Sequence, residues 1–107
     1  MTQVLDFQNF DTTIKNNDVV LVDFYADWCG PCKALAPTLE NVSNQYDGKA
    51  IVAKVNVDKN PELSAQFGVR SIPALFYFKN GTLVGKQSGI QSQAHISENI
   101  SNLLNQN

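Results

Sequence analysis

Two long apolar segments with a helical pattern between them constrain the fold of this chain most. Val19 to Tyr25 and residues 51–57 are nearly continuous runs of apolar, β-branched and aromatic residues. Such runs are typical of strands that are covered on both faces. Between them, Leu35, Leu39 and Val42 recur at helical spacing, which predicts an amphipathic helix. The segment therefore predicts a strand, a helix and a second strand in one sheet.

Glycine, proline and asparagine mark the ends of the neighbouring helices. Gly48 stands after the first helix, where a glycine commonly forms the C-cap. Asn60 as N-cap, Pro61 at the first helical position and Gly68 at the end predict a short second helix.

A hairpin and a final helix are predicted in the second half of the chain. Asn80-Gly81 is a strong signal for a two-residue turn and separates residues 74–79 from residues 82–87, which should form antiparallel strands. An apolar stripe then predicts an amphipathic C-terminal helix, through Ile96, Ile100, Leu103 and Leu104. The N-terminal region adds a strand and a short helix around residues 9–15. The predicted class is α/β, with a mixed central β-sheet in the order βαβαβαββα flanked by helices.

Length and charge exclude several classes of function. The chain has 107 residues, enough for one domain over residues 1–107 but too few for two. A net charge of -2 gives no basic face for nucleic acid and no patch for a membrane surface. The N-terminal residues lack the basic start and apolar run of a signal peptide, and no segment reaches membrane-spanning length. We expect a monomeric cytoplasmic protein, in a compartment where thiols stay reduced unless they are catalytic or regulatory.

The only two cysteines, Cys29 and Cys32, are separated by Gly30 and Pro31. This spacing fits a reversible disulfide, half of a zinc site or a small structural crosslink. A structural zinc ion takes four Cys or His ligands, and the chain adds only His95, far away in the sequence. A crosslink over so short a loop removes little entropy from the unfolded chain. The redox interpretation needs only the two thiols that are present.

The position of the cysteines predicts a different task for each. Cys29 follows a strand and precedes a helix, where free backbone N–H groups and the helix dipole favour a thiolate. It should be the attacking sulfur. Cys32 lies one helical turn onward, should be less exposed, and would break the mixed disulfide from within. Gly30 and Pro31 carry no charge that would stabilise the thiolate further, which favours a reductant over an oxidant.

Asp23 is a carboxylate within an apolar strand, where burial is costly. A buried polar group at a strand end is the plainer interpretation, but a perturbed acid near a reactive thiol commonly has a catalytic task. Burial should raise its pKa and suit it to accept the proton of Cys32. Lys54 on the neighbouring strand would supply its countercharge, unless it simply extends its ammonium group to solvent.

Residues 22–33, with the sequence VDFYADWCGPCK, resemble the active-site stretch of the thioredoxin family. Further matches occur in the same order and spacing at Ala36-Pro37, Val57-Asp58, Ile72-Pro73, Phe78-Lys79-Asn80-Gly81 and Gly89. The resemblance therefore covers essentially the whole chain and is highly specific.

The resemblance implies a thioredoxin fold and a general protein-disulfide reductant. It implies disulfide-containing protein substrates and recharging by a thioredoxin reductase, a flavoprotein that draws on NADPH. The chain itself would need no cofactor beyond its redox-active cysteine pair. The same resemblance supports Asp23 as the base for Cys32.

The resemblance also implies a substrate groove around the cysteines. Proline bonds are cis in only about 5–6% of cases, so the sequence alone favours a trans Pro73. The resemblance instead implies a cis Ile72-Pro73 bond, with the backbone of Ile72 available to pair with an extended substrate. Trp28 and Gly89 would line this groove beside Gly30 and Pro31, although a tryptophan is often largely buried in a core.

Three residues depart from the commonest family pattern: Tyr25, Ala74 and Ile90. Ala74 and Ile90 would border the substrate surface and affect partner preference. A different function class remains open, a binding module whose thiols only switch its affinity for a partner, and an oxidant of the periplasm is a weaker third. His95 is expected at the surface, without a catalytic role.

Overall fold

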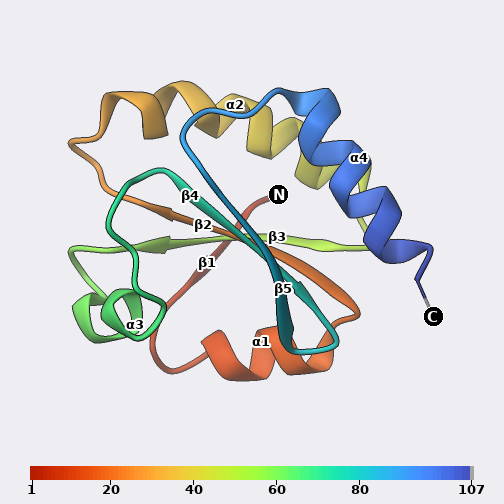
Figure 1. The fold of residues 1–107 in the computed structure, drawn as a ribbon, viewed down its shortest axis with the longest axis horizontal. Helices are drawn as coiled ribbons and strands as arrows, with labels where there is room; N and C mark the ends of the chain where they lie inside the picture. Colours follow the sequence, from red (N-terminus) through yellow and green to blue (C-terminus); the bar gives the residue numbers. More distant parts are fainter. Residues whose placement is uncertain (107) are drawn as a thin grey trace.

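The fold is a mixed β-sheet between two layers of helices (Figure 1). The structure is a computed structural model and describes residues 1–106. Its elements are β1 (Gln3–Leu5), α1 (Phe10–Asn16), β2 (Val19–Tyr25), α2 (Gly30–Gln45), β3 (Ile51–Asn56), α3 (Pro61–Gln66), β4 (Ala74–Lys79), β5 (Thr82–Ser88) and α4 (Gln93–Leu104). The predicted order of strands and helices is confirmed.

Strand β2 lies at the centre of the sheet, whose strand order is β1-β3-β2-β4-β5. Strands β1 and β2 run parallel to β3, whereas β4 runs antiparallel to both β2 and β5. Side chains on both faces of β2 are buried, and six of its seven residues are in the buried class. This position explains why the sequence of β2 is apolar throughout instead of alternating.

Each face of the sheet carries its own apolar core. Helices α1 and α3 cover one face, and α2 and α4 cover the other (Figure 1). The first core is rich in phenylalanine, with edge-to-face ring contacts among Phe10, Phe67, Phe76 and Phe78. The second core is mainly aliphatic and is formed by β2, β3, β4 and the apolar stripes of α2 and α4, including Leu21, Leu35, Leu39, Val42, Leu75, Ile96 and Ile100.

The ends of several elements differ from the sequence prediction in detail, and β5 extends to Ser88, one residue later than predicted. Helix α2 ends at Gln45 with Tyr46 as its C-cap, so Gly48 (φ 79°) lies in the following turn and does not cap the helix directly. Asn60 is the N-cap residue of α3, as predicted, but its side chain makes no capping hydrogen bond to the helix. Its side-chain oxygen accepts from the Phe7 N–H at 3.2 Å, and its amide donates to the Asn56 carbonyl at 3.0 Å. Strand β3 ends at Asn56, one residue earlier than predicted.

Within residues 1–106, no helix combines the length and apolar character that crossing a membrane requires.

The β4–β5 turn is held against the end of α1. Asn80 and Gly81 both have positive φ, 51° and 82°, as a type I′ turn requires. The Asn80 N–H donates to the Asp18 carbonyl at 2.8 Å, and Lys79 Nζ lies 2.8 Å from the Asp18 carboxylate. A Cβ at Gly81 would lie 3.3 Å from Lys15 Cγ. The turn therefore requires glycine for its backbone angle and has little space for a side chain.

We predict that Gly81→Ala lowers the free energy of unfolding by about 1–2 kcal/mol, because a left-handed backbone strains any residue with a Cβ. Gly85→Ala is the matched control in the same hairpin: φ is not positive there, and the nearest atom would be 3.8 Å away. It should be neutral or slightly stabilising. Urea denaturation of both variants measures the difference, and equal losses would contradict this account of the turn.

Candidate active site

Cys29 and Cys32 form a disulfide across the first turn of α2, with their Cα atoms 5.2 Å apart. Strand β2 ends four residues before Cys29, so the pair lies at the carboxyl end of the central strand. Cys29 is the N-cap residue of α2, with an extended backbone, and its sulfur accepts a hydrogen bond from the Cys32 N–H at 3.2 Å. The structure thus places the two sulfurs within reach of each other for exchange.

The start of α2 is electrostatically suited to a thiolate. Backbone N–H groups of the first turn point toward the N-terminus of the helix, which carries the positive end of its dipole. The first turn of α2 contains no acidic residue that would neutralise this end. Since α2 has 16 residues, its dipole is well developed. Once the disulfide is reduced, this position stabilises a negative charge on Cys29.

The predicted difference in exposure between the cysteines is absent in the disulfide form. Cys29 is 5% exposed and Cys32 is 4% exposed. Both pack with Ala26, and partly buried Ile72 and Val57 contact the same cluster. Because the bond holds both sulfurs against one apolar surface, exposure alone cannot distinguish their roles in this state.

The loop before β4 lies beside the disulfide. The Ile72-Pro73 peptide bond is cis, as the resemblance implied. The Ile72 carbonyl oxygen is 3.9 Å from Cys29 Sγ. The Gly89 N–H donates to the Pro73 carbonyl at 2.8 Å. Ile72 therefore contacts the cysteine pair directly, and Gly89 from a second loop is joined to the adjacent Pro73.

Trp28 lies on the surface immediately before Cys29. Its side chain is 70% exposed, so it belongs to the surface and not to the core. The indole N–H donates to the Asp58 carboxylate at 2.8 Å. This hydrogen bond orients the ring, and Gly30 and Pro31, both exposed, continue the same surface.

Asp23 and Cys32 line one cavity of about 390 Å³ that also includes Lys54. The three side chains come from β2, α2 and β3 respectively. Asp23 is only 4% exposed, and its Oδ1 has no hydrogen-bond partner within residues 1–106. Burial raises the pKa of Asp23 from 3.8 to about 7, although the charge of Lys54 lowers it in part. Asp23 can therefore hold or release a proton near neutral pH, in the same cavity as Cys32.

Lys54 acts on Asp23 without a direct ion pair. The two residues are register partners in the parallel β2–β3 ladder. No ion pair between them occurs in the part of the chain that the structure describes, where the pairs are Met1–Glu40 and Lys79–Asp18. Lys54 Nζ lies 5.3 Å from the centre of the Tyr25 ring, a distance typical of a cation–π contact. The countercharge therefore acts through space across the cavity.

Sequence reasoning gave no role to Asp58, Thr2 or Glu40. Asp58 follows the carboxyl end of β3, next to the end of β2, so its proximity to Trp28 could have been predicted from the topology. Thr2 and Glu40 line the cavity of Asp23, where the Thr2 N–H donates to Glu40 Oε1 at 3.0 Å. No local pattern signals a contact between residues so distant in sequence.

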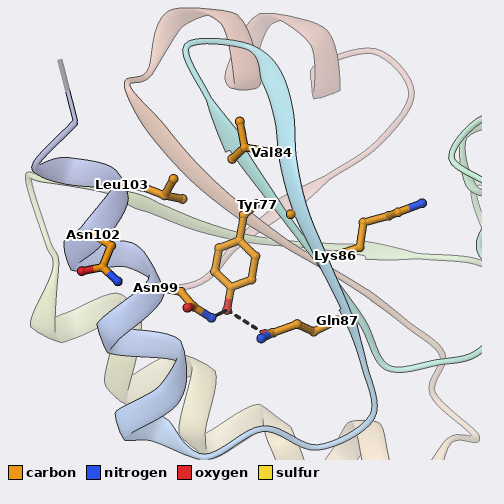
Figure 2. A pocket seen from close by; sticks show the side chains of 8 residues that line it. Tyr77, Val84, Lys86, Gln87, Asn99, Asn102 and Leu103 are labelled. Carbon is orange, nitrogen blue, oxygen red and sulfur yellow. Dashed lines mark hydrogen bonds between the residues drawn. The ribbon is translucent and has the colours of Figure 1, made fainter.

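A second cavity, of about 230 Å³, lies between β5 and α4 (Figure 2). Tyr77 projects into it, donates to Gln87 Oε1 at 3.2 Å and accepts from the Asn99 amide at 3.3 Å. Gln87 in turn lies 2.6 Å from Nε2 of His95, which is exposed on α4 as expected. Neither cysteine nor any carboxylate lines this cavity. The redox chemistry therefore belongs to the site at the start of α2.

Comparisons with known proteins agree over almost the whole chain. A family model described as Thioredoxin matches residues 1–102. The thioredoxin of Staphylococcus saprophyticus is 50% identical over 92 residues, which are 86% of this chain and 88% of the relative. The thioredoxin of Chlorobaculum thiosulfatiphilum is 46% identical over 94 residues, 87% of each chain. A solved structure of a mutant thioredoxin from Halobacterium salinarum superposes with a TM-score of 0.92 at 37% identity, over 99% of this chain and 93% of that one. The family model, the sequence identity to these relatives and the shared fold agree, and the chain belongs to the thioredoxin family.

Proposed function

We propose that this protein-disulfide oxidoreductase works as a general reductant of protein disulfides and is recharged by an NADPH-dependent thioredoxin reductase. The observation that carries the proposal is the Cys29–Cys32 disulfide at the N-terminus of α2, with neutral Gly30 and Pro31 between the sulfurs. A site that stabilised the reduced thiolate much further would favour oxidation of substrates instead.

The proposed reaction proceeds through one mixed disulfide. The Cys29 thiolate attacks one sulfur of the substrate disulfide, that S–S bond breaks, and the leaving thiolate takes a proton from solvent. The Cys32 thiol then gives its proton to the Asp23 carboxylate, and the Cys32 thiolate attacks Cys29 Sγ. The Cys29–Cys32 bond forms, the second substrate thiolate leaves, and two electrons have passed to the substrate. The reductase returns two electrons from NADPH to the disulfide.

Asp23 is the proposed base for the second step. It shares a cavity with Cys32, and its pKa of about 7 leaves both protonation states populated near neutral pH. A general base is most effective when its pKa is close to the working pH. Lys54 is proposed to tune this value, since its charge opposes the effect of burial on the same carboxyl.

The proposed substrate groove runs beside the disulfide. The backbone of Ile72 would pair with an extended substrate segment, because its carbonyl lies near Cys29 and Ile72 stands outside strand β4. Pro73 and Gly89, joined by a hydrogen bond, would line the groove next to Ile72, and exposed Trp28 would offer an apolar contact. We propose no resident cofactor and place the activity in the cytoplasm, where the dithiol is kept reduced.

The two cysteines should fail differently when they are replaced. Cys29→Ser should abolish reduction of insulin by a thiol donor, because the attacking sulfur is gone. Cys32→Ser should accumulate a covalent mixed disulfide with the substrate, because attack occurs but no internal thiol resolves it. Non-reducing gel electrophoresis and mass spectrometry detect that adduct. Normal turnover by the Cys32 variant would show that the assigned roles are wrong.

Asp23→Asn should stabilise the oxidised protein at pH 8 and lower the rate at which the reduced protein reduces disulfides. The pKa of Asp23 is higher in the folded state than in the unfolded state. The free energy of unfolding of the wild-type protein therefore falls as pH rises from about 4 to about 7, and it stays lower above pH 7. The interval corresponds to roughly 4 kcal/mol at most. The variant should gain roughly 2–4 kcal/mol at pH 8, and the gain should vanish near pH 4.

Denaturant melts of both proteins across this pH range test the stability half, and insulin reduction at pH 6 to 8 tests the kinetic half. Asp47→Asn, at an exposed position, removes the same charge as a control. A variant that is less stable than wild type at pH 8, or equally fast at every pH, would return Asp23 to a structural role.

A further inference from the structure

A hollow of about 220 Å³ opens next to the proposed substrate groove. The segment before Pro73 forms one side of it, and strands β4 and β5 form the other. Arg70 and Ser71 lie two and one residues before Ile72, and Ser88 pairs with Ala74 just before Gly89. The hollow therefore continues the surface on which Ile72 and Gly89 lie.

The charged groups that line this hollow are both cations. Arg70 and Lys86 are its charged side chains, and no carboxylate contributes to its wall. Hydroxyl groups of Ser71 and Ser88 add further hydrogen-bond donors. Within residues 1–106, neither Arg70 nor Lys86 takes part in an ion pair. The lining thus has the chemistry that a carboxylate requires.

Lys86 is held over the hollow by its contact with an aromatic ring. It pairs with Phe76 across the β4–β5 ladder, so both side chains lie on the same face of the sheet. Lys86 Nζ lies 5.8 Å from the centre of the Phe76 ring, and Phe76 itself lines the hollow. This cation–π contact favours a lysine that stays near the wall over one that extends freely into solvent.

Two exposed cations on a protein surface usually have no specific ligand, but these two come from separate segments and share one concave site. Like charges brought to one hollow repel each other, and a bound anion relieves that repulsion. An extended peptide advances about 3.3 Å per residue, with alternate side chains on the same face. A substrate segment paired with Ile72 would therefore direct a side chain near its cysteine toward Arg70 and Lys86.

We propose that the hollow between Arg70 and Lys86 is a subsite for an acidic side chain of the substrate polypeptide. It selects disulfides that have Asp or Glu a few residues from the attacked cysteine. This proposal rests on the groove of the proposed function and names the substrate class that the groove prefers. The subsite contributes to substrate binding, so it changes KM more than kcat.

The affinity of oxidised wild-type protein for extended peptides tests the subsite without any redox step. Each peptide has alanine in place of the attacked cysteine. A single Glu is placed at one of about four positions on either side of this alanine, and a matched peptide has Gln at the same position. The fluorescence of Trp28, the only tryptophan, reports binding in the groove. We expect Glu to bind about fivefold more tightly than Gln at one position, or at two positions of the same strand face, and equally elsewhere.

Arg70→Gln combined with Lys86→Gln should remove this preference, because both residues are exposed and their loss should leave the fold intact. Lys49→Gln removes one like charge at the opposite end of the sheet and should keep it. A denaturant melt of each variant verifies folding. Equal affinity for Glu and Gln at every position, or a preference that survives in the double variant, would overturn the subsite.

Reduction of the corresponding cysteine peptides, as neutral 2-pyridyl disulfides, separates the two proposals. The Cys29 thiolate of the previously reduced protein attacks the peptide sulfur and forms a mixed disulfide with the peptide, and 2-pyridinethione leaves. The absorbance of 2-pyridinethione gives the rate. The proposed subsite predicts that kcat/KM is about fivefold higher for the Glu peptide than for the Gln peptide at the same position, because KM is lower. Failure of the wild-type protein to reduce either peptide would contradict the proposed function. The ratio of the affinities for the Glu and Gln peptides tests the subsite independently of that result.

Discussion

Strand β2 sets the conditions for both the core and the active site. It pairs with β3 on one side and with β4 on the other, and helices cover both of its faces. Every side chain along it must therefore tolerate burial, and the run of valine, leucine and phenylalanine meets that demand. The carboxyl end of such a strand is fixed by its neighbours on both sides. Cys29 lies four residues after the end of β2, so the fixed end of the strand also fixes its position at the start of α2.

Asp23 is the exception within this strand, and its burial ties stability to chemistry. Its side chain is almost fully buried and Oδ1 has no hydrogen-bond partner within residues 1–106, so burial raises its pKa to about 7, although the charge of Lys54 lowers it in part. An apolar residue at this position would give a more stable protein at neutral pH. The cost is understandable if the proton of Cys32 needs an acceptor in the same cavity. Polar groups that weaken a core are expected where they serve a site.

The architecture could be predicted from sequence because its signals are local. Apolar runs, helical periodicity and the Asn80-Gly81 turn each reflect a backbone preference of a few adjacent residues, and they gave the complete order of elements. Side-chain contacts between distant segments could not be predicted in this way. Asn60 is the N-cap residue of α3 as predicted, but its side chain accepts from the Phe7 N–H, which tertiary structure brings close, and not from the helix. The geometry at Pro73 is a similar case, since local preference favours trans and only the family resemblance implied cis.

The site was predicted in outline for the same reason. The cysteine pair and Asp23 stand out locally, one by its spacing and the other as a charge in an apolar strand. The absence of a direct Asp23–Lys54 ion pair depends on side-chain placement across the cavity. The location of Arg70 and Lys86 on one hollow depends on the register of β4 with β5. Neither can be read from composition or spacing.

The most direct test is the order in which the two reduced cysteines react. Iodoacetamide alkylates thiolates, so brief treatment of the reduced protein near pH 7, followed by peptide mapping, compares the thiolate character of each sulfur. The N-terminus of α2 stabilises a charge on Cys29, and this effect decays within the first turn. Label should therefore appear on Cys29 well before Cys32. Equal labelling, or labelling of Cys32 first, would contradict the assignment of Cys29 as the attacking sulfur.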